Sequence, residues 1–345
     1  MDIVVLKFGG TSVRDEGLRY HVLKHIRREV NAGYKVLVVV SAMGRLGDPY
    51  STDTLKSLID NHSSKREYDR LLSCGEIISS IVMSDFIQRN GLNATSISPQ
   101  EVGIQTDDNY QNANILKVET DMILERFKEF DVLIAPGFVG MGTDGSLTTL
   151  GRGGSDTSAI ALGGALDAVF VDIYSDVEGV MTADPKLVKD AKLLKKISYD
   201  NLICMAARGA KVIHLKAIEL AEKHHVNLRL RATTKDHIGT YVAEEATETL
   251  SLTYQLDYDR YEIEEIQLPA GCPCLHKQGT SWYAKAADQE DTCRFLQKNG
   301  IPYSVKSGYV RIIWLNRQKE LVEVVFFVDA DKLEEMMNFL HYNLI

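Results

Sequence analysis

The sequence contains no run of eighteen apolar residues, which is about the length that a membrane-spanning helix requires. Its first residues pass directly into an apolar stretch at residues 3–6, without the basic segment that opens a secretory signal peptide. We therefore expect a cytoplasmic protein without a membrane partner.

The sequence has fewer basic than acidic residues. The chain has 39 Lys and Arg against 48 Asp and Glu, a formal net charge of -9, and no basic stripe interleaved with aromatic residues. This balance argues against a nucleic-acid partner. An acidic substrate would have to meet cationic side chains placed locally.

Cysteine is scarce, with five residues in 345, and an odd number in a chain of this size fits reduced thiols. Only Cys272 and Cys274 are close in sequence. Because no second Cys or His pair at metal-site spacing accompanies them, no protein-held metal site is predicted.

Alternating strand and helix patterns fill most of the chain, whose length suggests two domains. The strands are short continuous apolar runs, which are typical of a parallel sheet buried on both faces. We predict an α/β sandwich around a mainly parallel sheet. Strands are expected at 3–6, 36–40, 94–98, 132–135, 168–174 and 227–232, and helices at 15–32, 54–61, 65–88, 115–130, 159–166, 199–208 and 215–224.

A glycine loop, KFGGTS at residues 7–12, follows the first strand and precedes a helical pattern. A lysine at the start of such a loop is placed to meet phosphate oxygens, although Lys7 can also simply end a strand. The G-x-x-x-x-G-K-[ST] pattern is absent, so a P-loop fold is not expected.

The stretch GRGGSD at residues 151–156 is the strongest local signal. Its glycines allow a tight turn and close approach of the backbone, and Ser155 or Asp156 is a natural N-cap for the helix that follows. Helix amides and the Arg152 guanidinium then predict an anion site. Asp156 beside it requires either a cationic partner or a role in organising the site, because an unpaired carboxylate would repel the anion. The alternative is a capped turn with a solvated arginine.

Other loops carry weaker signals. Gly75 inside a helical pattern indicates close approach of a neighbour, and the adjacent Glu76 either meets a substrate amine or is a surface carboxylate. The run 140–145 matches G-x-G-x-x-G, but β character follows it, so we interpret it as a hairpin turn. Small and acidic residues at 175–185 fit ribose or magnesium binding, or simple turns.

Six motifs, taken together and in order, resemble those of aspartokinases over about residues 1–243. They are KFGGTS at 7–12, SAMG at 41–44, GE at 75–76, TLGRGGSD at 149–156, DVEGV at 176–180 and GAKV at 209–212. The resemblance implies an amino-acid-kinase three-layer sandwich and ATP-dependent phosphorylation of the side-chain carboxylate of L-aspartate to 4-phospho-L-aspartate. This is the first step towards lysine, threonine and methionine.

The same resemblance implies the roles of individual residues, with ATP and Mg²⁺ as cofactors. It implies catalytic roles for Lys7, Arg152 and Asp156, aspartate binding by Thr52, Glu76, Arg152 and Ser155, and nucleotide binding by Lys7, Gly9, Gly10, Ser175, Asp176, Met181, Lys186 and Lys211. The chain differs from the family pattern at Ser175, Met181 and Lys186, in extra residues at 45–51, and at Leu215, where the family usually has proline.

After an acidic linker at 243–249, strand patterns and two helical patterns suggest a second domain at 250–345, following a catalytic domain at 1–243. They suggest a ferredoxin-like βαββαβ unit that resembles the ACT modules of aspartokinases. Its expected roles are amino-acid effector binding or the pairing of subunits in a homodimer or higher homo-oligomer. Two alternatives stay open: a kinase for another small carboxylate, and a weakly active regulatory paralogue that binds nucleotide or amino acid.

Overall fold

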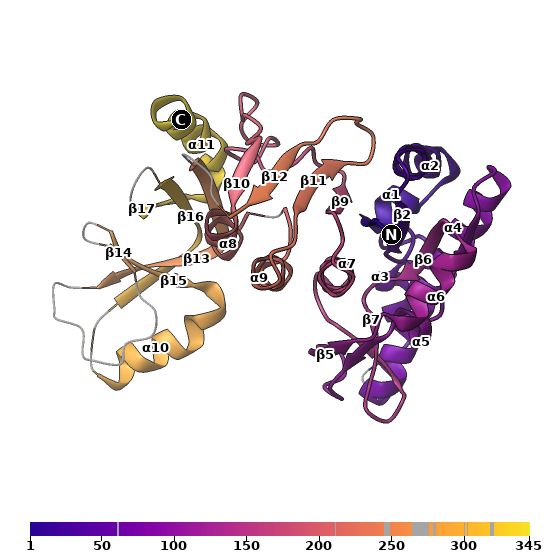
Figure 1. Cartoon of the computed structure of the whole chain (residues 1–345). Helices are drawn as coiled ribbons and strands as arrows, with labels where there is room; N and C mark the ends of the chain where they lie inside the picture. Colours follow the sequence, from indigo (N-terminus) through magenta and orange to yellow (C-terminus); the bar gives the residue numbers. More distant parts are fainter. Residues whose placement is uncertain are drawn as a thin grey trace. The chain divides into compact units, whose positions relative to one another are not determined.

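The computed structural model describes residues 1–60, 62–210, 212–244, 249–263, 276–278, 281–299, 301, 303–317 and 321–345. Figure 1 labels the helices and strands of the chain. The chain divides into two compact units. The first comprises residues 1–180, 193–203 and 212–246, and the second comprises 181–192, 204–211 and 247–345. Segments 181–192 and 204–211, expected within the domain 1–243, thus pack with the second unit.

The first unit is built on an eight-stranded sheet with the order β10-β12-β11-β9-β1-β2-β6-β3. Every pairing in it is parallel except that between β11 and β12, which confirms the prediction of a mainly parallel sheet. The strands are β1 (Ile3–Phe8), β2 (Lys35–Val40), β3 (Ala94–Ser96), β6 (Val132–Pro136), β9 (Val171–Ser175), β10 (Lys196–Ser198), β11 (Leu228–Ala232) and β12 (Thr240–Ala243).

Most of the predicted helices are present. Short helices at Gly10–Val13 and Pro99–Val102 are additional, the helix expected at 159–166 begins at Gly154, and two expected helices differ more. The region 115–130 is not one helix but a strand followed by a helix, because Ile115 and Val118 pair with β4 before the chain turns. The helix expected at 54–61 begins earlier and is shorter, since Ser51 caps it. The helices are α1 (Gly10–Val13), α2 (Glu16–Asn31), α3 (Thr52–Lys56), α4 (Lys65–Arg89), α5 (Pro99–Val102), α6 (Asp121–Glu129), α7 (Gly154–Ala165), α8 (Tyr199–Ala207), which crosses between the units, and α9 (Leu215–Lys223).

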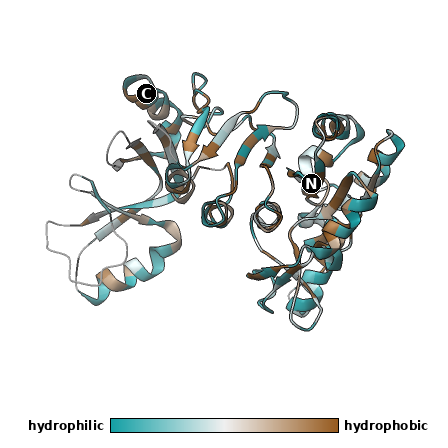
Figure 2. Ribbon diagram, viewed as in Figure 1, coloured by the Kyte–Doolittle hydropathy of each residue, from teal (hydrophilic) through white to brown (hydrophobic). Residues whose placement is uncertain are grey.

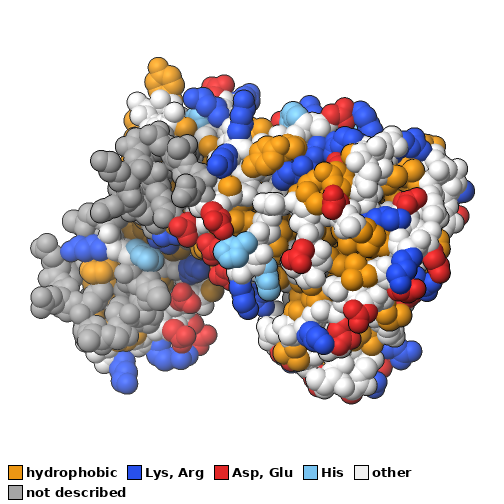
Figure 3. All heavy atoms as spheres, in the orientation of Figure 1, with side chains coloured by type: hydrophobic (Ala, Val, Ile, Leu, Met, Phe, Trp, Pro, Cys, Tyr) orange, Lys and Arg blue, Asp and Glu red, His pale blue; other side chains and the backbone are white. Residues whose placement is uncertain are grey.

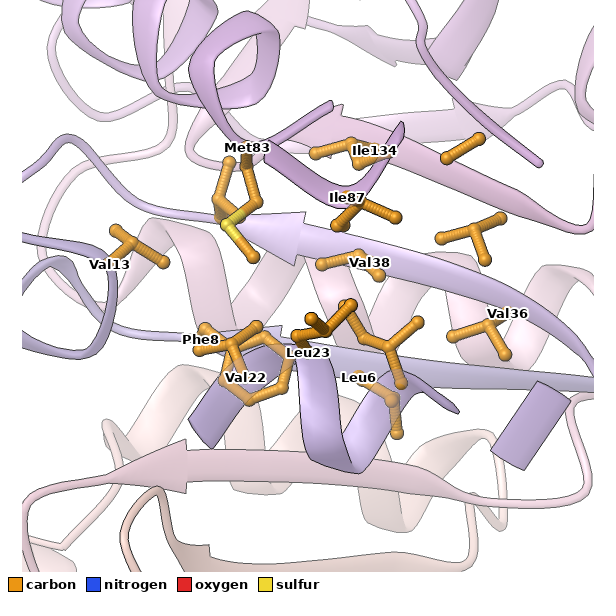
Figure 4. Packing of buried hydrophobic residues seen from close by; sticks show 14 of the residues in the cluster. Leu6, Phe8, Val13, Val22, Leu23, Val36, Val38, Met83, Ile87 and Ile134 are labelled. Carbon is orange, nitrogen blue, oxygen red and sulfur yellow. The ribbon is translucent and has the colours of Figure 1, made fainter. Parts of the chain in front are cut away.

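One face of the sheet is covered by α2 and α4. Leu6 and Phe8 of β1 belong to a buried cluster with residues of both helices, and Figure 4 shows this packing. Figure 2 shows hydrophobic residues on the strands and hydrophilic ones along the outer sides of the helices. Because side chains alternate along a strand, Lys7 points to the opposite face, where α7 lies.

Among the described helices, α4 is the one whose length and composition would also fit a membrane span. More than half of its most apolar window is buried inside the protein. Met83, Phe86 and Ile87 of α4 pack in the cluster against the sheet.

A second, smaller sheet of the first unit has the order β5-β4-β7-β8. Its strands are β4 (Ile104–Thr106), β5 (Ile115–Val118), β7 (Val139–Met141) and β8 (Leu147–Thr149). The antiparallel pairing of β7 with β8 places the glycine run 140–145 across a hairpin turn, as predicted.

Among the residues that the structure describes, the second unit contains an antiparallel five-stranded sheet with the order β14-β15-β13-β16-β17 and two complete helices, together with the last residues of α8. Its elements are β13 (Thr249–Ile263), β14 (His276–Gln278), β15 (Ser281–Lys285), α10 (Gln289–Lys298), β16 (Tyr303–Arg317), β17 (Leu321–Asp329) and α11 (Leu333–Leu344), with single 3-10 turns at Ala286–Asp288 and Ala330–Lys332. The expected α+β class is confirmed. The element order of the described residues is not βαββαβ, because three strands precede α10.

Part of this unit comes from within the segment assigned to the first domain by sequence. Ala183 and Val188 are buried in a cluster with residues of β13, β16 and α11. Thr182 contributes a hydroxyl 3.0 Å from Nε2 of His341. Apolar packing of the segment 181–192 therefore explains why it belongs to the second unit.

Candidate active site

The centre of the site is an ion pair between Lys7 and Asp156. Lys7 Nζ lies 2.5 Å from Asp156 Oδ1, and the two side chains are only 11% and 15% exposed. Lys7 comes from the central strand β1 and Asp156 from the first turn of α7. Asp156 thus has the cationic partner that the sequence required, and the pair joins two of the predicted motifs.

The glycine loop after β1 packs tightly on the loop after β2. A Cβ on Gly10 would lie 2.3 Å from the carbonyl oxygen of Ala42, and the Gly44 amide donates to the Gly10 carbonyl at 3.0 Å. A Cβ on Gly9 would lie 3.9 Å from Lys7 Nζ. Glycine at position 10 is therefore needed for close approach of the two loops, and the lysine ammonium lies beside the first glycine.

The N-terminus of α7 is capped differently from the prediction. Its N-cap is Gly153, with φ +71°, and neither Ser155 nor Asp156 caps it. Both lie in the first turn of the helix, so their side chains are not committed to the helix's own amides. Side-chain capping would compete with a bound anion for those amides. Arg152 beside this turn is exposed and forms no hydrogen bond or ion pair with any residue that the structure describes.

Glu76 lies on α4 and is only 2% exposed. Its Oε1 accepts hydrogen bonds from the Ala42 amide at 3.2 Å and the Thr52 hydroxyl at 3.4 Å, while Oε2 has no partner among the described residues. Burial raises the pKa of Glu76 to about 8. The carboxyl is therefore a buried group and not a surface carboxylate, and it lies next to Thr52, as the motif assignment required.

Gly75 confirms the predicted close approach of a neighbour. A Cβ at this position would lie 2.9 Å from the carbonyl oxygen of Tyr50 and 3.0 Å from both Ala42 Cβ and Leu55 Cδ1. The helix α4 can thus come within contact of the loop 41–51 only because residue 75 has no side chain.

The residues expected to bind nucleotide do not all lie in the first unit. Ser175 ends β9, and Asp176 after it forms an exposed ion pair with Arg45 at 3.1 Å. Met181 and Lys186 belong to the segment 181–192 of the second unit. Lys211, expected to bind nucleotide, lies outside the described residues.

Thr233 is one residue that the motif comparison missed, although it connects two parts of the site. Its amide and hydroxyl donate to the Ser175 carbonyl at 3.0 and 3.2 Å, and its hydroxyl lies 2.6 Å from that of Ser12. His25 Nε2 donates to its carbonyl at 2.9 Å. Burial lowers the pKa of His25 to about 4, so this imidazole is neutral at pH 7. The only signal for Thr233 in the sequence is its position directly after the strand expected at 227–232.

Leu215, where the related sequences usually have proline, is the first residue of α9. Proline is favoured at this position but is not required there, because the amide has no partner inside the helix. The preceding His214 packs against the glycine turn: a Cβ on Gly153 would lie 2.3 Å from His214 Cβ. The substitution therefore leaves the start of α9 intact.

No group of three or more His, Cys, Asp or Glu side chains among the described residues is arranged to hold a metal ion. Figure 3 shows basic side chains mixed with acidic ones on the viewed face.

Comparison with known proteins identifies the family. The model of the amino acid kinase family matches residues 2–231, and the chain belongs to this family. The chain is 46% identical over 245 residues to aspartokinase 1 of Bacillus subtilis (strain 168), a match that covers 70% of this chain and 61% of that protein. A match to the aspartokinase of Geobacillus stearothermophilus, 43% identical over 250 residues, covers 72% of this chain and 60% of the relative. The chain thus spans about three fifths of these relatives.

The fold also matches a solved structure over nearly its whole length. E. coli aspartokinase III in complex with aspartate and ADP covers 99% of this chain and 100% of its own, with a TM-score of 0.74 and 21% identity. At this identity the match concerns the fold. The structural match includes the second unit as well as the first. The two sequence matches, by contrast, cover 70% and 72% of the chain.

Proposed function

We propose that this protein is an aspartate kinase that transfers the γ-phosphoryl group of ATP to the side-chain carboxylate of L-aspartate. The observation that carries the proposal is the Lys7–Asp156 pair, which joins the glycine loop after β1 to the first turn of α7. Membership of the amino acid kinase family and 46% identity to a named aspartokinase support it. The E. coli structure that shares this fold contains aspartate and ADP.

The chemistry fits these side chains. A carboxylate is already an anionic nucleophile at pH 7, so the reaction needs no strong general base. The protein must hold two mutually repelling anions in line and offset charge on the transferring group. In this proposal Lys7 and the Gly9 and Gly10 amides contact the transferring phosphoryl group, and Asp156 fixes the ammonium of Lys7.

The substrate contacts follow from the same arrangement. Arg152, which is exposed and free of partners among the described residues, binds a carboxylate of aspartate, with the α7 amides near Ser155 as further donors. Glu76, with a free Oε2 beside Thr52, accepts from the substrate amino group. Ser175, Asp176, Met181, Lys186 and Lys211 contact the nucleotide. Mg²⁺ bound to the phosphates would reduce the charge that the attacking carboxylate meets.

Three further parts of the proposal concern the whole protein. Residues 1–243 supply catalysis, and residues 250–345 bind an amino-acid effector or pair subunits of a homo-oligomer. Another structure of E. coli aspartokinase III, in complex with lysine and aspartate, motivates the effector. A cytoplasmic location fits the substrates. Light scattering with and without lysine, threonine or methionine tests assembly and effector binding together.

The test of the reaction is ADP release from the purified protein with Mg-ATP, with and without L-aspartate. We expect aspartate-dependent turnover that is lost in Lys7→Ala and Arg152→Ala. If aspartate gives no stimulation while ATP still binds, the proposal fails. A panel of other small carboxylates then separates a changed substrate from a regulatory paralogue.

A further inference from the structure

Asp69 of α4 is a buried carboxylate that no motif includes. It is 0% exposed, and its Oδ2 accepts from the Thr149 amide at 2.8 Å and from the Gln111 amide at 2.9 Å. Its Oδ1 accepts from the Thr149 hydroxyl at 2.9 Å. Three donors thus converge on one side chain, and they come from the last residue of β8 and from the loop residue Gln111, both distant from Asp69 in sequence.

The segments that contain Thr149 and Gln111 enclose the start of the glycine turn that carries Arg152. Gly151 has φ +75°, and a Cβ there would lie 2.8 Å from Asn112 Oδ1 and 3.2 Å from the Gln111 carbonyl oxygen. Thr149 lies two residues before Gly151, and its carbonyl accepts from the Ala113 amide at 2.9 Å. The turn at 151–154 therefore packs against the segment at 111–112, and Asp69 links that segment to Thr149 through hydrogen bonds.

Asp69 satisfies these donors at a cost. Burial raises the pKa of its carboxyl, and the hydrogen bonds from Gln111 and Thr149 only partly oppose this shift. Among the residues that the structure describes, no Lys, Arg or His forms an ion pair with it. A buried anion without a cation is unfavourable unless its oxygens are fully used as acceptors. Only a side chain with two acceptor oxygens can receive all three bonds at once, which a neutral amide cannot do.

The helix α4 carries both Asp69 and Glu76, the residue proposed to bind the amino group of the substrate. Asp69 and Glu76 are seven residues apart on α4, about two turns, so they lie on the same face of the helix. Asp69 holds the segment leading to Arg152, and Glu76 accepts from the loop 41–52. One rigid element thus supports both loops assigned to aspartate binding.

We propose that Asp69 is a positioning residue for the aspartate-binding loop: through Thr149 and Gln111 it fixes the turn that presents Arg152 and the first amides of α7. The inference rests on the proposed function. It assigns Asp69 no contact with substrate, and it concerns binding of the carboxylate substrate rather than of ATP.

The test compares Asp69→Asn, Thr149→Val and Thr149→Ser with a matched control, Thr106→Val. Thr106 is also fully buried, and its hydroxyl lies 2.6 Å from that of Thr148 in the same small sheet, without contact with Asp69. We expect KM for aspartate to rise about tenfold in Asp69→Asn and about threefold in Thr149→Val, as the loss of one or two hydrogen bonds gives. KM for ATP should stay within about twofold, and Thr149→Ser should behave as wild type.

A second readout, amide hydrogen exchange over residues 149–157, requires no activity. Exchange there should be faster in Asp69→Asn and Thr149→Val and unchanged in Thr106→Val. The inference is overturned if KM for aspartate and this exchange are unchanged, or if Thr106→Val alters them equally. If wild-type protein shows no aspartate-dependent turnover, the proposed function fails, and the exchange comparison alone still decides the role of Asp69. If Asp69→Asn does not fold, Thr149→Val provides the same test, because it removes one of the hydrogen bonds to Asp69.

Discussion

Lys7 Nζ and Asp156 Oδ1 lie 2.5 Å apart, and this contact joins the central strand of the sheet to the first turn of α7. The two residues are 149 positions apart in sequence, and each belongs to a motif that is weak alone. The pair holds the Lys7 ammonium beside a helix N-terminus that has no side-chain cap, and the amides at such an end favour an anion.

Asp156→Asn should lower stability by about 1–3 kcal/mol, because it leaves the Lys7 ammonium largely buried without its anionic partner. Turnover should fall about a hundredfold, since the ammonium is no longer fixed. Chemical denaturation and steady-state kinetics measure the two effects. Glu16→Gln is the control, because Glu16 is also an acidic residue in the first turn of a helix but is exposed. It should change stability by less than about 0.5 kcal/mol.

Glu76 should make stability depend on pH. Burial raises the pKa of Glu76 from 4.5 to about 8, so between these values the unfolded chain has released this proton while the folded chain retains it. Stability should therefore fall as pH rises through that window, by at most about 1.4 kcal/mol per pH unit, and this contribution should level off above about pH 8. Glu76→Gln should remove this part of the decline, as urea denaturation at a series of pH values would measure.

Glu76 should also make substrate binding depend on pH: binding of aspartate should strengthen as pH rises, whereas stability falls. A substrate ammonium group favours the ionised carboxylate, so KM for aspartate should decrease as pH rises towards about 8. Glu76→Gln should raise KM and abolish its pH dependence. A wild-type KM that does not vary between pH 6 and 8 would contradict the role assigned to Glu76.

Gly75→Ala should destabilise the protein by about 1–3 kcal/mol, although alanine is the better helix former. The added Cβ would lie 2.9 Å from the Tyr50 carbonyl oxygen and 3.0 Å from two carbon atoms, so either α4 or the loop must move. KM for aspartate should increase with it. Gly17→Ala is the control, because its Cβ would be at an ordinary 3.4 Å from the nearest atom in the exposed part of α2. Thermal unfolding that ranks the two variants equally would refute this account.

Thr233→Val should raise KM for ATP about three- to tenfold, because the hydroxyl that joins Ser12 to the Ser175 carbonyl is lost. KM for aspartate should change less. Thr233→Ser retains the hydroxyl and should restore the wild-type value. Equal changes in both Michaelis constants would mean that Thr233 acts only through stability.

Much of the fold could be predicted because its signals are local. Apolar runs such as 36–40 identify buried parallel strands, and the helical pattern at 15–32 identifies α2. The prediction was wrong at 115–130, where the edge pairing of β5 with β4 overrides helical propensity. It was also wrong at the start of α7, where Gly153 takes a left-handed conformation and becomes the cap in place of Ser155 or Asp156.

The sequence by itself determined the family, the order of the motifs and the nature of the charged groups, because these depend on residue type and spacing. Only the tertiary structure decided that Lys7 pairs with Asp156, that Glu76 is buried, and that Asp69 and Thr233 join loops far apart in the chain. Such contacts depend on which residues the sheet and α4 bring together. Burial and distance then change the pKa of each group and the strength of its electrostatic interactions. Composition and spacing in the sequence do not encode these changes.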